Sequence, residues 1–497
     1  MQNPEDPLPE IKNEDRFTSF TSDVLILASG TIFAQILTIF VAPFITRLFG
    51  PESFGIWALY GSIVGIIVVI ACLRYELSIV LPQSDFEAAN LFAVCILFTI
   101  IVSGITTPVI FFFGTDIADL LNAPQLSSFF WLVPISVFLG GVSLSVYYWN
   151  SRIKDFKRAS VARVASSIST TGIQLGSGIA GYRTAGILII AGIFGQFISI
   201  LFVSIAILKH DFRLIRDSIN FQTMLEGIKR YSQFPLVDSI SALLNTISGS
   251  LPIILLAAFY SPIFAGFYSL SIAVIQLPSN LIGNAISQAF FPHANEAYRE
   301  DNLSLLVERL FKILIIVILF PLLILTMIGG DLFGIVFGNN WIEAGIFAQI
   351  LSIFFIVNFI MNPISLIYII LEKQVFGLYF NVINFLTRLI SLIIGGLFLD
   401  VYFTLILFTI VGIFVYTFVL IKLLKYAKVR FKNIINQLIS SLFLFFPAGL
   451  LLLIIQVYVK NPYVTVLIAS VSVVIYYLYI LKSDEQVRNI LIGLKIW

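Results

Sequence analysis

Two arginines lie inside segments that are otherwise apolar, where a charge is costly and usually functional. Arg163 and Arg388 both fall within runs long enough to cross a membrane. A guanidinium suits a phosphate, because its fork of N–H donors forms charge-assisted and often bidentate hydrogen bonds. The sequence therefore predicts a cationic, phosphate-binding site that uses these two residues.

Amide side chains recur at helical spacing in the same apolar runs. Residues three or four apart share a helix face, and amides both donate and accept hydrogen bonds, as sugar hydroxyls do. We therefore expect a hydrated cavity for a sugar phosphate; the alternative is that small polar side chains only join helices. The candidate sugar contacts are Gln174, Asn245, Gln276, Asn280, Asn284, Gln288 and Asn384.

Three further charged residues stand at the ends of apolar runs. Arg74 is a further candidate contact for the substrate, and Glu76 follows it closely; the alternative is that the two pair at the membrane interface. Asp238 has three interpretations: it binds a coupling cation, pairs with an arginine, or caps the helix that follows Pro235. Glu76 and Asp238 are therefore the candidates for coupling to a sodium ion or a proton.

The elements that must position these residues are membrane-spanning helices. The chain has 497 residues, of which 59% are hydrophobic and only 11% charged, whereas soluble proteins carry about 25% charged residues. A spanning helix needs about 20 apolar residues. We predict an all-α integral membrane protein with about 14 spans, at 24–46, 54–80, 88–112, 127–149, 160–181, 184–208, 235–259, 263–290, 305–329, 342–369, 376–399, 401–424, 437–459 and 462–482.

Lysines and arginines are divided unequally between alternate loops. Of the 29 in the chain, 24 fall in the termini and in the loops on one side. The other side carries only Arg47, Arg183 and Lys460. Because basic loops stay in the cytoplasm, the sequence predicts a multi-pass protein with both termini in the cytoplasm.

A P-x-x-x-G motif beginning at Pro51 returns at Pro262, about 210 residues later. Such a repeat predicts two pseudo-symmetric six-helix lobes around a central cavity, and the two turns that carry it are expected at an outer gate. The predicted parts are a cytoplasmic tail (1–23), an N-lobe (24–208), a cytoplasmic amphipathic linker (209–234), a C-lobe (235–425), two C-terminal helices (426–482) and a cytoplasmic tail (483–497).

Two segments carry a family resemblance. They read GTIFAQILTIFVAPFITRLFGPESFGIWALY and GFYSLSIAVIQLPSNLIGNAISQAFFPHANEAY. The first resembles the N-terminal region of bacterial polysaccharide and O-antigen flippases, and the second resembles their second lobe. These flippases belong to the multidrug/oligosaccharidyl-lipid/polysaccharide exporter superfamily. The resemblance agrees with two lobes and two extra helices.

The resemblance also implies a function. Such proteins transfer an undecaprenyl-diphosphate-linked oligosaccharide, a repeat unit of O-antigen, capsule or exopolysaccharide, to the periplasmic leaflet of the inner membrane by alternating access. The expected partners are the lipid-linked substrate, membrane lipid, and the glycan polymerase and glycosyltransferases of the pathway. We expect no cofactor, no metal, no nucleic acid and no enzymatic activity.

Two other functions compete with the flippase. A cation-coupled multidrug antiporter of the same superfamily usually has twelve helices and an acidic or aromatic cavity, so the extra helices and inward arginines argue against it. A membrane glycan polymerase or ligase needs a sizeable external loop with catalytic residues. No predicted external loop exceeds about fifteen residues.

Overall fold

The structure, a computed structural model, describes residues 13–483, without the side chains of residues 13–29, 206, 208, 210, 281, 284, 285, 288, 289 and 374. Much of the two predicted tails, 1–23 and 483–497, therefore lies outside the described residues. Every regular element within the described range is helical. Twelve of these helices are long and apolar enough to cross a membrane. The predicted class, an all-α multi-pass membrane protein, is confirmed.

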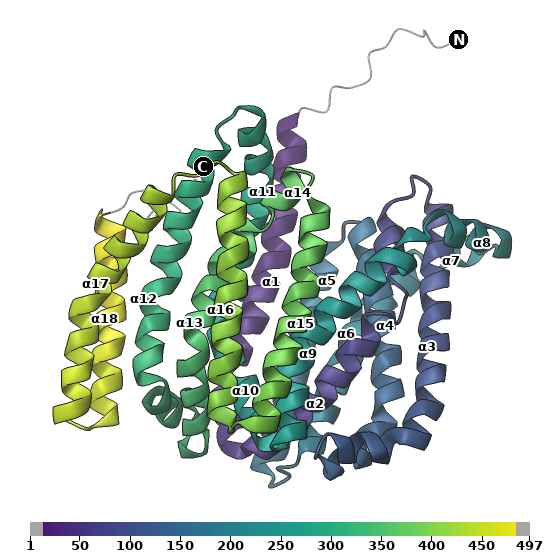
Figure 1. Cartoon of the computed structure of the whole chain (residues 1–497). Coiled ribbons are helices and arrows are strands. Elements are labelled where there is room, and N and C mark those ends of the chain that lie inside the picture. Colours follow the sequence, from purple (N-terminus) through teal and green to yellow (C-terminus); the bar gives the residue numbers. More distant parts are fainter. Residues whose placement is uncertain (1–12, 484–497) are drawn as a thin grey trace. The chain divides into compact units, whose positions relative to one another are not determined.

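Fifteen helices form the framework (Figure 1). They are α1 (Asn13–Leu48), α2 (Pro51–Val68), α3 (Asp85–Leu120), α4 (Val133–Arg152), α5 (Phe156–Ile179), α6 (Ala185–His210), α9 (Ser239–Phe259), α10 (Pro262–Ile275), α11 (Asn284–Arg299), α12 (Leu303–Phe337), α13 (Ile342–Ile364), α15 (Gln374–Phe398), α16 (Val401–Tyr426), α17 (Phe431–Tyr458) and α18 (Pro462–Ser483). The shorter pieces are α7 (Phe212–Ser218), α8 (Phe221–Arg230), α14 (Ile367–Ile370), the 3₁₀ helices η1 (Tyr75–Val80), η2 (Pro124–Leu132) and η5 (Asn339–Trp341), and the π-helices η3 (Phe234–Asp238) and η4 (Ser279–Gly283).

Two of the fourteen predicted spans are absent from the twelve apolar helices. At 160–181 the structure has α5, whose many hydroxyl and glycine residues lower its hydropathy. At 263–290 the prediction of one helix was wrong, because the chain forms α10, η4 and α11 in succession. Pro278 lies at this break, where it lacks the N–H that would continue the helix.

The helix predicted at 54–80 is also interrupted. α2 ends at Val68, and the chain turns before it continues as η1. Leu73 and Arg74 have φ angles of 49° and 62°. These values belong to the left-handed region, which a right-handed helix cannot contain. The prediction of one continuous helix was therefore wrong at the point where Arg74 is placed.

The segment predicted as an amphipathic linker, 209–234, contains two short helices, α7 and α8. Asn220 separates them, and its Oδ1 accepts hydrogen bonds from the backbone N–H groups of Gln222 (2.9 Å) and Thr223 (3.4 Å), which caps α8. Asn90 of α3 holds the break: its Nδ2 donates to the Ser218 carbonyl and its Oδ1 accepts from the Asn220 N–H, both at 2.8 Å. α8 buries none of its residues.

The described chain divides into two compact units. The first contains residues up to Ile45, Val64–Gly114 and Phe129–Ile240. The second contains Thr46–Ile63, Thr115–Ser128 and the chain from Ser241 onward. The lobes expected at 24–208 and 235–425 stay a prediction.

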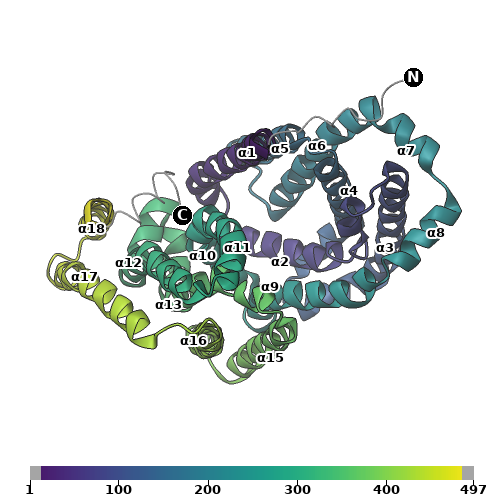
Figure 2. The same ribbon diagram turned by 90° about the horizontal axis from the view of Figure 1, so that it is seen from above.

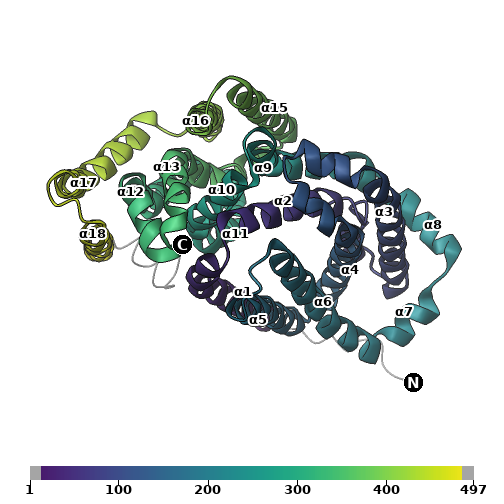
Figure 3. The ribbon, with the colours of Figure 1, turned by 90° about the horizontal axis from the view of Figure 1, so that it is seen from below.

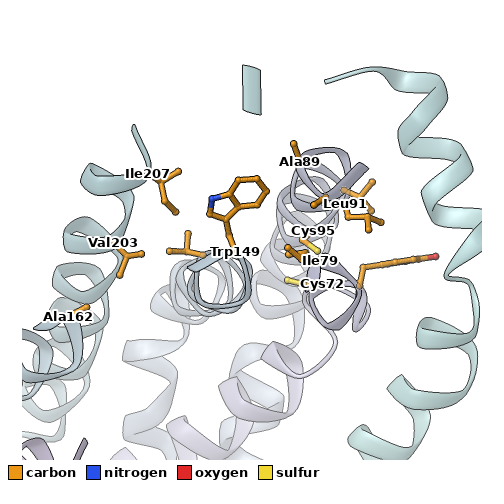
Figure 4. Packing of buried hydrophobic residues seen from close by; sticks show 13 residues of the cluster. Cys72, Ile79, Ala89, Leu91, Cys95, Trp149, Ala162, Val203 and Ile207 are labelled. Carbon is orange, nitrogen blue, oxygen red and sulfur yellow. The ribbon is translucent and has the colours of Figure 1, made fainter. Parts of the chain in front are cut away.

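The core of the first unit surrounds Trp149 of α4 (Figure 4). Val203 and Ile207 of α6 lie on one side of the indole, and Leu91 and Cys95 of α3 lie on the other. The same cluster includes Cys72, Tyr75 and Ile79 from the segment that follows α2. This packing fixes the irregular segment that carries Arg74 and Glu76.

α12 is the central helix of the second unit, and most of its apolar residues are buried. It packs against α13 and against the pair α17 and α18 (Figure 1). Gly329 and Gly345 permit the close approach of α12 and α13, because a β carbon on either would lie within 2.5 Å of the other's carbonyl oxygen. The C-terminal helices therefore pack on the outside of α12.

The two copies of the P-x-x-x-G motif contact each other in the second unit, where α10 lies against the first turns of α2 (Figure 3). A β carbon on Gly55 would lie 1.7 Å from the Pro262 carbonyl oxygen. A β carbon on Gly266 would lie 2.1 Å from the Pro51 carbonyl oxygen. Only glycine fits at these positions, and the contact is reciprocal. The placement of these turns at an outer gate stays a prediction.

Candidate functional site

Arg163 lines a cavity of about 290 Å³ in the first unit. The cavity lies among α4, α5 and α6, and Arg163 stands in the second turn of α5, whose start is capped by Asp155. The Arg163 Nη1 donates a hydrogen bond to Thr31 Oγ1, and its Cζ lies 5.7 Å from the centre of the Tyr147 ring. The half-buried Arg163 guanidinium is thus held at the edge of the cavity.

The α4 wall of this cavity carries Ser143, Tyr147 and Asn150. Asn150 is buried; its Nδ2 donates to the Asp155 carbonyl oxygen at 2.6 Å, while its Oδ1 has no hydrogen-bond partner within the described structure. Ser199 of α6 adds another hydroxyl. A cation with amide and hydroxyl groups around it has the chemistry to bind a phosphate and an adjacent sugar.

The residues of this α4 wall are not among those predicted from the sequence, although their spacing carries a signal. Ser143, Tyr147 and Asn150 follow one another at steps of four and three residues, which is the spacing of one helix face. They were overlooked because they stand at the end of an apolar run, next to a basic loop.

The hydroxyl face of α5 has a different role. Figure 2 shows α5 between α1 and α6. Ser167 Oγ donates to the Ala34 carbonyl of α1 at 3.2 Å, and Thr170 lies against Gly195 of α6. These hydroxyls therefore join helices. Gln174, a candidate sugar contact on the same helix, is only 4% exposed.

Arg74, Glu76 and Asp238 are brought together in the first unit. Arg74 Nε donates to Asp238 Oδ2 at 2.8 Å, and Arg74 Nη1 lies 3.4 Å from Glu76 Oε1. Of the three interpretations of Asp238, the structure shows the pairing with an arginine. Asp238 belongs to η3, and π turns inside helices frequently mark functional sites.

Glu76 is fully buried, and its Oε2 has no hydrogen-bond partner among the described atoms. It lies between the spans α2 and α3 rather than within one. Burial raises the pKa of the Glu76 carboxyl, although the nearby Arg74 charge opposes that shift. Two adjacent residues with positive φ, Leu73 and Arg74, add backbone strain of about 1–3 kcal/mol each.

We expect Glu76→Gln to raise the thermal stability of the protein at pH 8. The folded protein holds the Glu76 proton more tightly than the unfolded chain does, so the wild type loses stability as the pH rises above the ordinary value of 4.5. Glutamine cannot ionise and escapes this loss, so the advantage should shrink between pH 8 and pH 5. Melting curves across this range test the prediction; Glu226→Gln, on exposed α8, is the control. A stability gain independent of pH would contradict it.

Arg388 of α15 lies among aromatic side chains in the second unit. Its Nη1 donates to the Ser248 carbonyl at 3.3 Å and its Nη2 to the Tyr416 hydroxyl at 3.1 Å. The Arg388 Cζ also lies 5.9 and 5.8 Å from the ring centres of Phe354 and Phe408. Arg388 is therefore held by contacts within its own unit, and its role in phosphate binding stays a prediction.

The remaining amides are dispersed. Asn384 is buried, whereas Asn245 and Asn280 are exposed. Gln276 ends α10, and η4 interrupts the four-residue spacing that was expected to place Gln276, Asn280, Asn284 and Gln288 on one face. A π turn adds a residue to the helical repeat, and the shared face stays a prediction. The side chains of Asn284 and Gln288 lie outside the described part.

The structure matches solved transporters. One is a lipid II flippase, MurJ, in an inward closed conformation, with a TM-score of 0.69 and 14% identity over 92% of this chain and 99% of that one. Another is an inward-facing multidrug resistance MATE family transporter of the MOP superfamily, with a TM-score of 0.63 and 15% identity over 81% of this chain and 95% of that one. At such identities the likeness concerns the fold alone.

Sequence comparison gives the family. The teichuronic acid biosynthesis protein TuaB of Bacillus subtilis (strain 168) is 28% identical over 146 residues, which are 28% of this chain and 29% of TuaB. This chain thus matches less than a third of that relative's length. A family model described as "Polysaccharide biosynthesis protein" matches residues 44–346, more than half of the chain. The fold matches, to a flippase and to a transporter of the MOP superfamily, are of the kind that the sequence resemblance led us to expect. By the match of its family model, the protein belongs to the polysaccharide biosynthesis protein family.

Proposed function

We propose that the protein is a non-enzymatic flippase. It transfers an undecaprenyl-diphosphate-linked oligosaccharide from the cytoplasmic to the periplasmic leaflet of the bacterial inner membrane by alternating access. The observation that carries the proposal is the cavity at Arg163, a polar, cation-lined space in a membrane protein of this family. A lipid-linked sugar needs such a space, because its charged and hydroxylated head cannot cross hydrocarbon without polar partners.

In this proposal Arg163 and the polar residues of α4 bind different parts of the substrate. The Arg163 guanidinium holds a phosphate of the diphosphate, where a charge-assisted hydrogen bond contributes about 1.5–3 kcal/mol. Asn150 and Ser143 contact the sugar next to it, and the lipid tail stays in the bilayer. Further candidate contacts are Arg74, Arg388, Asn384 and the other amides.

Glu76 and Asp238 are the ion-coupling residues of the proposal. Arg74 bridges both carboxylates, so the charge on Glu76 determines how strongly Arg74 is drawn away from Asp238. Uptake or release of a proton or a sodium ion at Glu76 would thereby favour one conformation of η3 over another. η3 is the irregular turn that leads into α9.

The multidrug antiporter remains the second candidate, because the MATE transporter shares the fold. The flippase match extends over more of this chain, 92% against 81%, in keeping with the additional helices α17 and α18. Drug susceptibility of a deletion strain separates the two functions. An antiporter predicts increased sensitivity to cationic drugs, and the flippase predicts none.

The flippase itself is tested by the lipid-linked sugars of a deletion strain. We expect undecaprenyl-diphosphate-linked oligosaccharide to accumulate on the cytoplasmic face, and surface glycan to be lost. Mass spectrometry of extracted lipids measures the amount of the lipid-linked oligosaccharide, and labelling of sugars from the periplasmic side shows in which leaflet it lies. A strain that makes normal surface glycan without accumulation would refute the proposal, provided that no second flippase gene is present.

A further inference from the structure

A second cavity, of about 330 Å³, lies in the second unit where α1, α12 and α18 end or begin. This volume falls near the lower end of the range of small-molecule sites. Its polar lining consists of Arg47 at the end of α1, Asp331 in α12, Asn339 in η5 and Tyr463 in α18. Gly330 and Gly334 expose backbone between these side chains.

The charged groups of this cavity have unused hydrogen-bonding capacity. Arg47 Nη2 donates to the Ile335 carbonyl oxygen at 2.7 Å, which orients the guanidinium and leaves its other donors available. The Asp331 carboxylate has neither a hydrogen-bond nor an ion-pair partner among the described residues, and it does not pair with Arg47. Tyr463 is 70% exposed, so its ring and hydroxyl are accessible.

This combination selects a ligand by its charge. Arg47 attracts a phosphate or a carboxylate that Asp331 repels, and Asp331 attracts an ammonium group that Arg47 repels, so the pair gives no net preference to a ligand of either charge. A neutral molecule with many hydroxyls uses both, because each hydroxyl donates to one group and accepts from another. The glycines let a ring approach the backbone closely, and Tyr463 offers an apolar face with a polar tip.

We propose that this cavity binds a neutral sugar unit. The predicted topology places its elements on the outer side, since the end of α1 and the turn before α18 belong to the loops poor in lysine and arginine. We take the source of the sugar to be the glycan delivered to that side, and this part of the inference rests on the proposed function. Binding itself follows from the lining residues.

Saturation-transfer NMR on the full-length protein in lipid nanodiscs tests the site. The probes are methyl glycosides of glucose, N-acetylglucosamine and rhamnose, with inorganic phosphate followed by ³¹P as the rival ligand. The variants are Tyr463→Ala, Asp331→Leu and Tyr463→Trp. The matched control is Tyr458→Ala, since Tyr458 is 81% exposed at the end of α17 and does not line the cavity.

We expect at least one glycoside to give a signal with wild type, Tyr458→Ala and Tyr463→Trp. The signal should be about five-fold weaker with Tyr463→Ala and Asp331→Leu, as expected when one hydrogen-bonding or ring contact is lost. Equal signals in all variants, no signal from any glycoside, or binding of phosphate in their place would overturn the site. Since this assay contains no lipid-linked substrate, its failure is distinguishable from failure of the flippase, which the deletion strain tests.

Discussion

Replacing Arg163 with alanine is expected to abolish the surface glycan while the protein stays in the membrane. Arg163 is the only cation among the described residues that line its cavity. Loss of a charge-assisted hydrogen bond costs about 1.5–3 kcal/mol, roughly 10- to 100-fold in substrate affinity. Arg163→Lys should retain part of the activity, because lysine keeps the charge but loses the bidentate geometry. Glycan display and the amount of protein in the membrane are measured together.

Arg183→Ala is the matched control for Arg163. Arg183 is an exposed arginine in the turn between α5 and α6 that donates to the Gly178 carbonyl, and it does not line the cavity. Its loss should leave the glycan unchanged. Arg388→Ala tests the second predicted phosphate contact in the same assay. If the Arg163→Ala strain displays normal amounts of glycan with a normal amount of the protein in the membrane, Arg163 does not bind the substrate.

Replacing Gly55 or Gly266 with alanine is expected to disrupt the contact between the two repeat motifs. Each new methyl would collide with a backbone carbonyl, of Pro262 and of Pro51 respectively, and a carbonyl in a packed helix cannot move aside at low cost. Overpacking costs about 1–3 kcal/mol. We therefore expect a fall of several degrees in melting temperature and reduced glycan display.

Gly61→Ala is the control for this contact. Gly61 lies in the same helix, α2, and an added β carbon would meet nothing within 4 Å; alanine there should be neutral or slightly stabilising. The double variant Gly55→Ala/Gly266→Ala should cost less than the sum of the single variants, because either methyl already separates the helices. If the two losses of stability were strictly additive, or if Gly61→Ala had an equal effect, the contact between α2 and α10 would not be the cause of the lost stability.

The class of fold could be predicted from the sequence because it depends on hydropathy averaged over long segments. Long apolar runs form spanning helices, and the loop charges gave a consistent pattern across the chain. The repeated P-x-x-x-G motif also predicted that its two copies are related. The structure then placed Gly55 and Gly266 against each other, a contact between residues more than 200 positions apart that periodicity cannot specify.

The failures occurred where local backbone geometry overrides the apolar pattern. Nothing in the hydropathy of 54–80 indicates that Leu73 and Arg74 adopt positive φ angles, and the amides after Gln276 look evenly spaced until η4 inserts a π turn. Such features depend on packing against other segments. The turn at Leu73 and Arg74 matters for the proposed ion coupling, because it carries the Arg74 side chain that pairs with Asp238.

The candidate site was predicted in part. Arg163 was identified by its charge in an apolar run, since charges within membrane segments are rare and usually functional. The spacing of its neighbours Tyr147 and Asn150 shows a shared helix face, but it does not show their cavity, which arises from the packing of three helices. Arg388 met the same criterion as Arg163 but lies within an aromatic cluster. Sequence spacing does not separate these two environments.

The most direct test of flipping uses purified protein in liposomes. The vesicles contain a polyprenyl-diphosphate-linked oligosaccharide in both leaflets, and a glycosidase added outside cleaves only the sugars of the outer leaflet. With wild-type protein the inner-leaflet fraction should also be cleaved, whereas it should stay protected in vesicles that contain Arg163→Ala or no protein. Equal protection with wild-type protein and without protein would contradict the account.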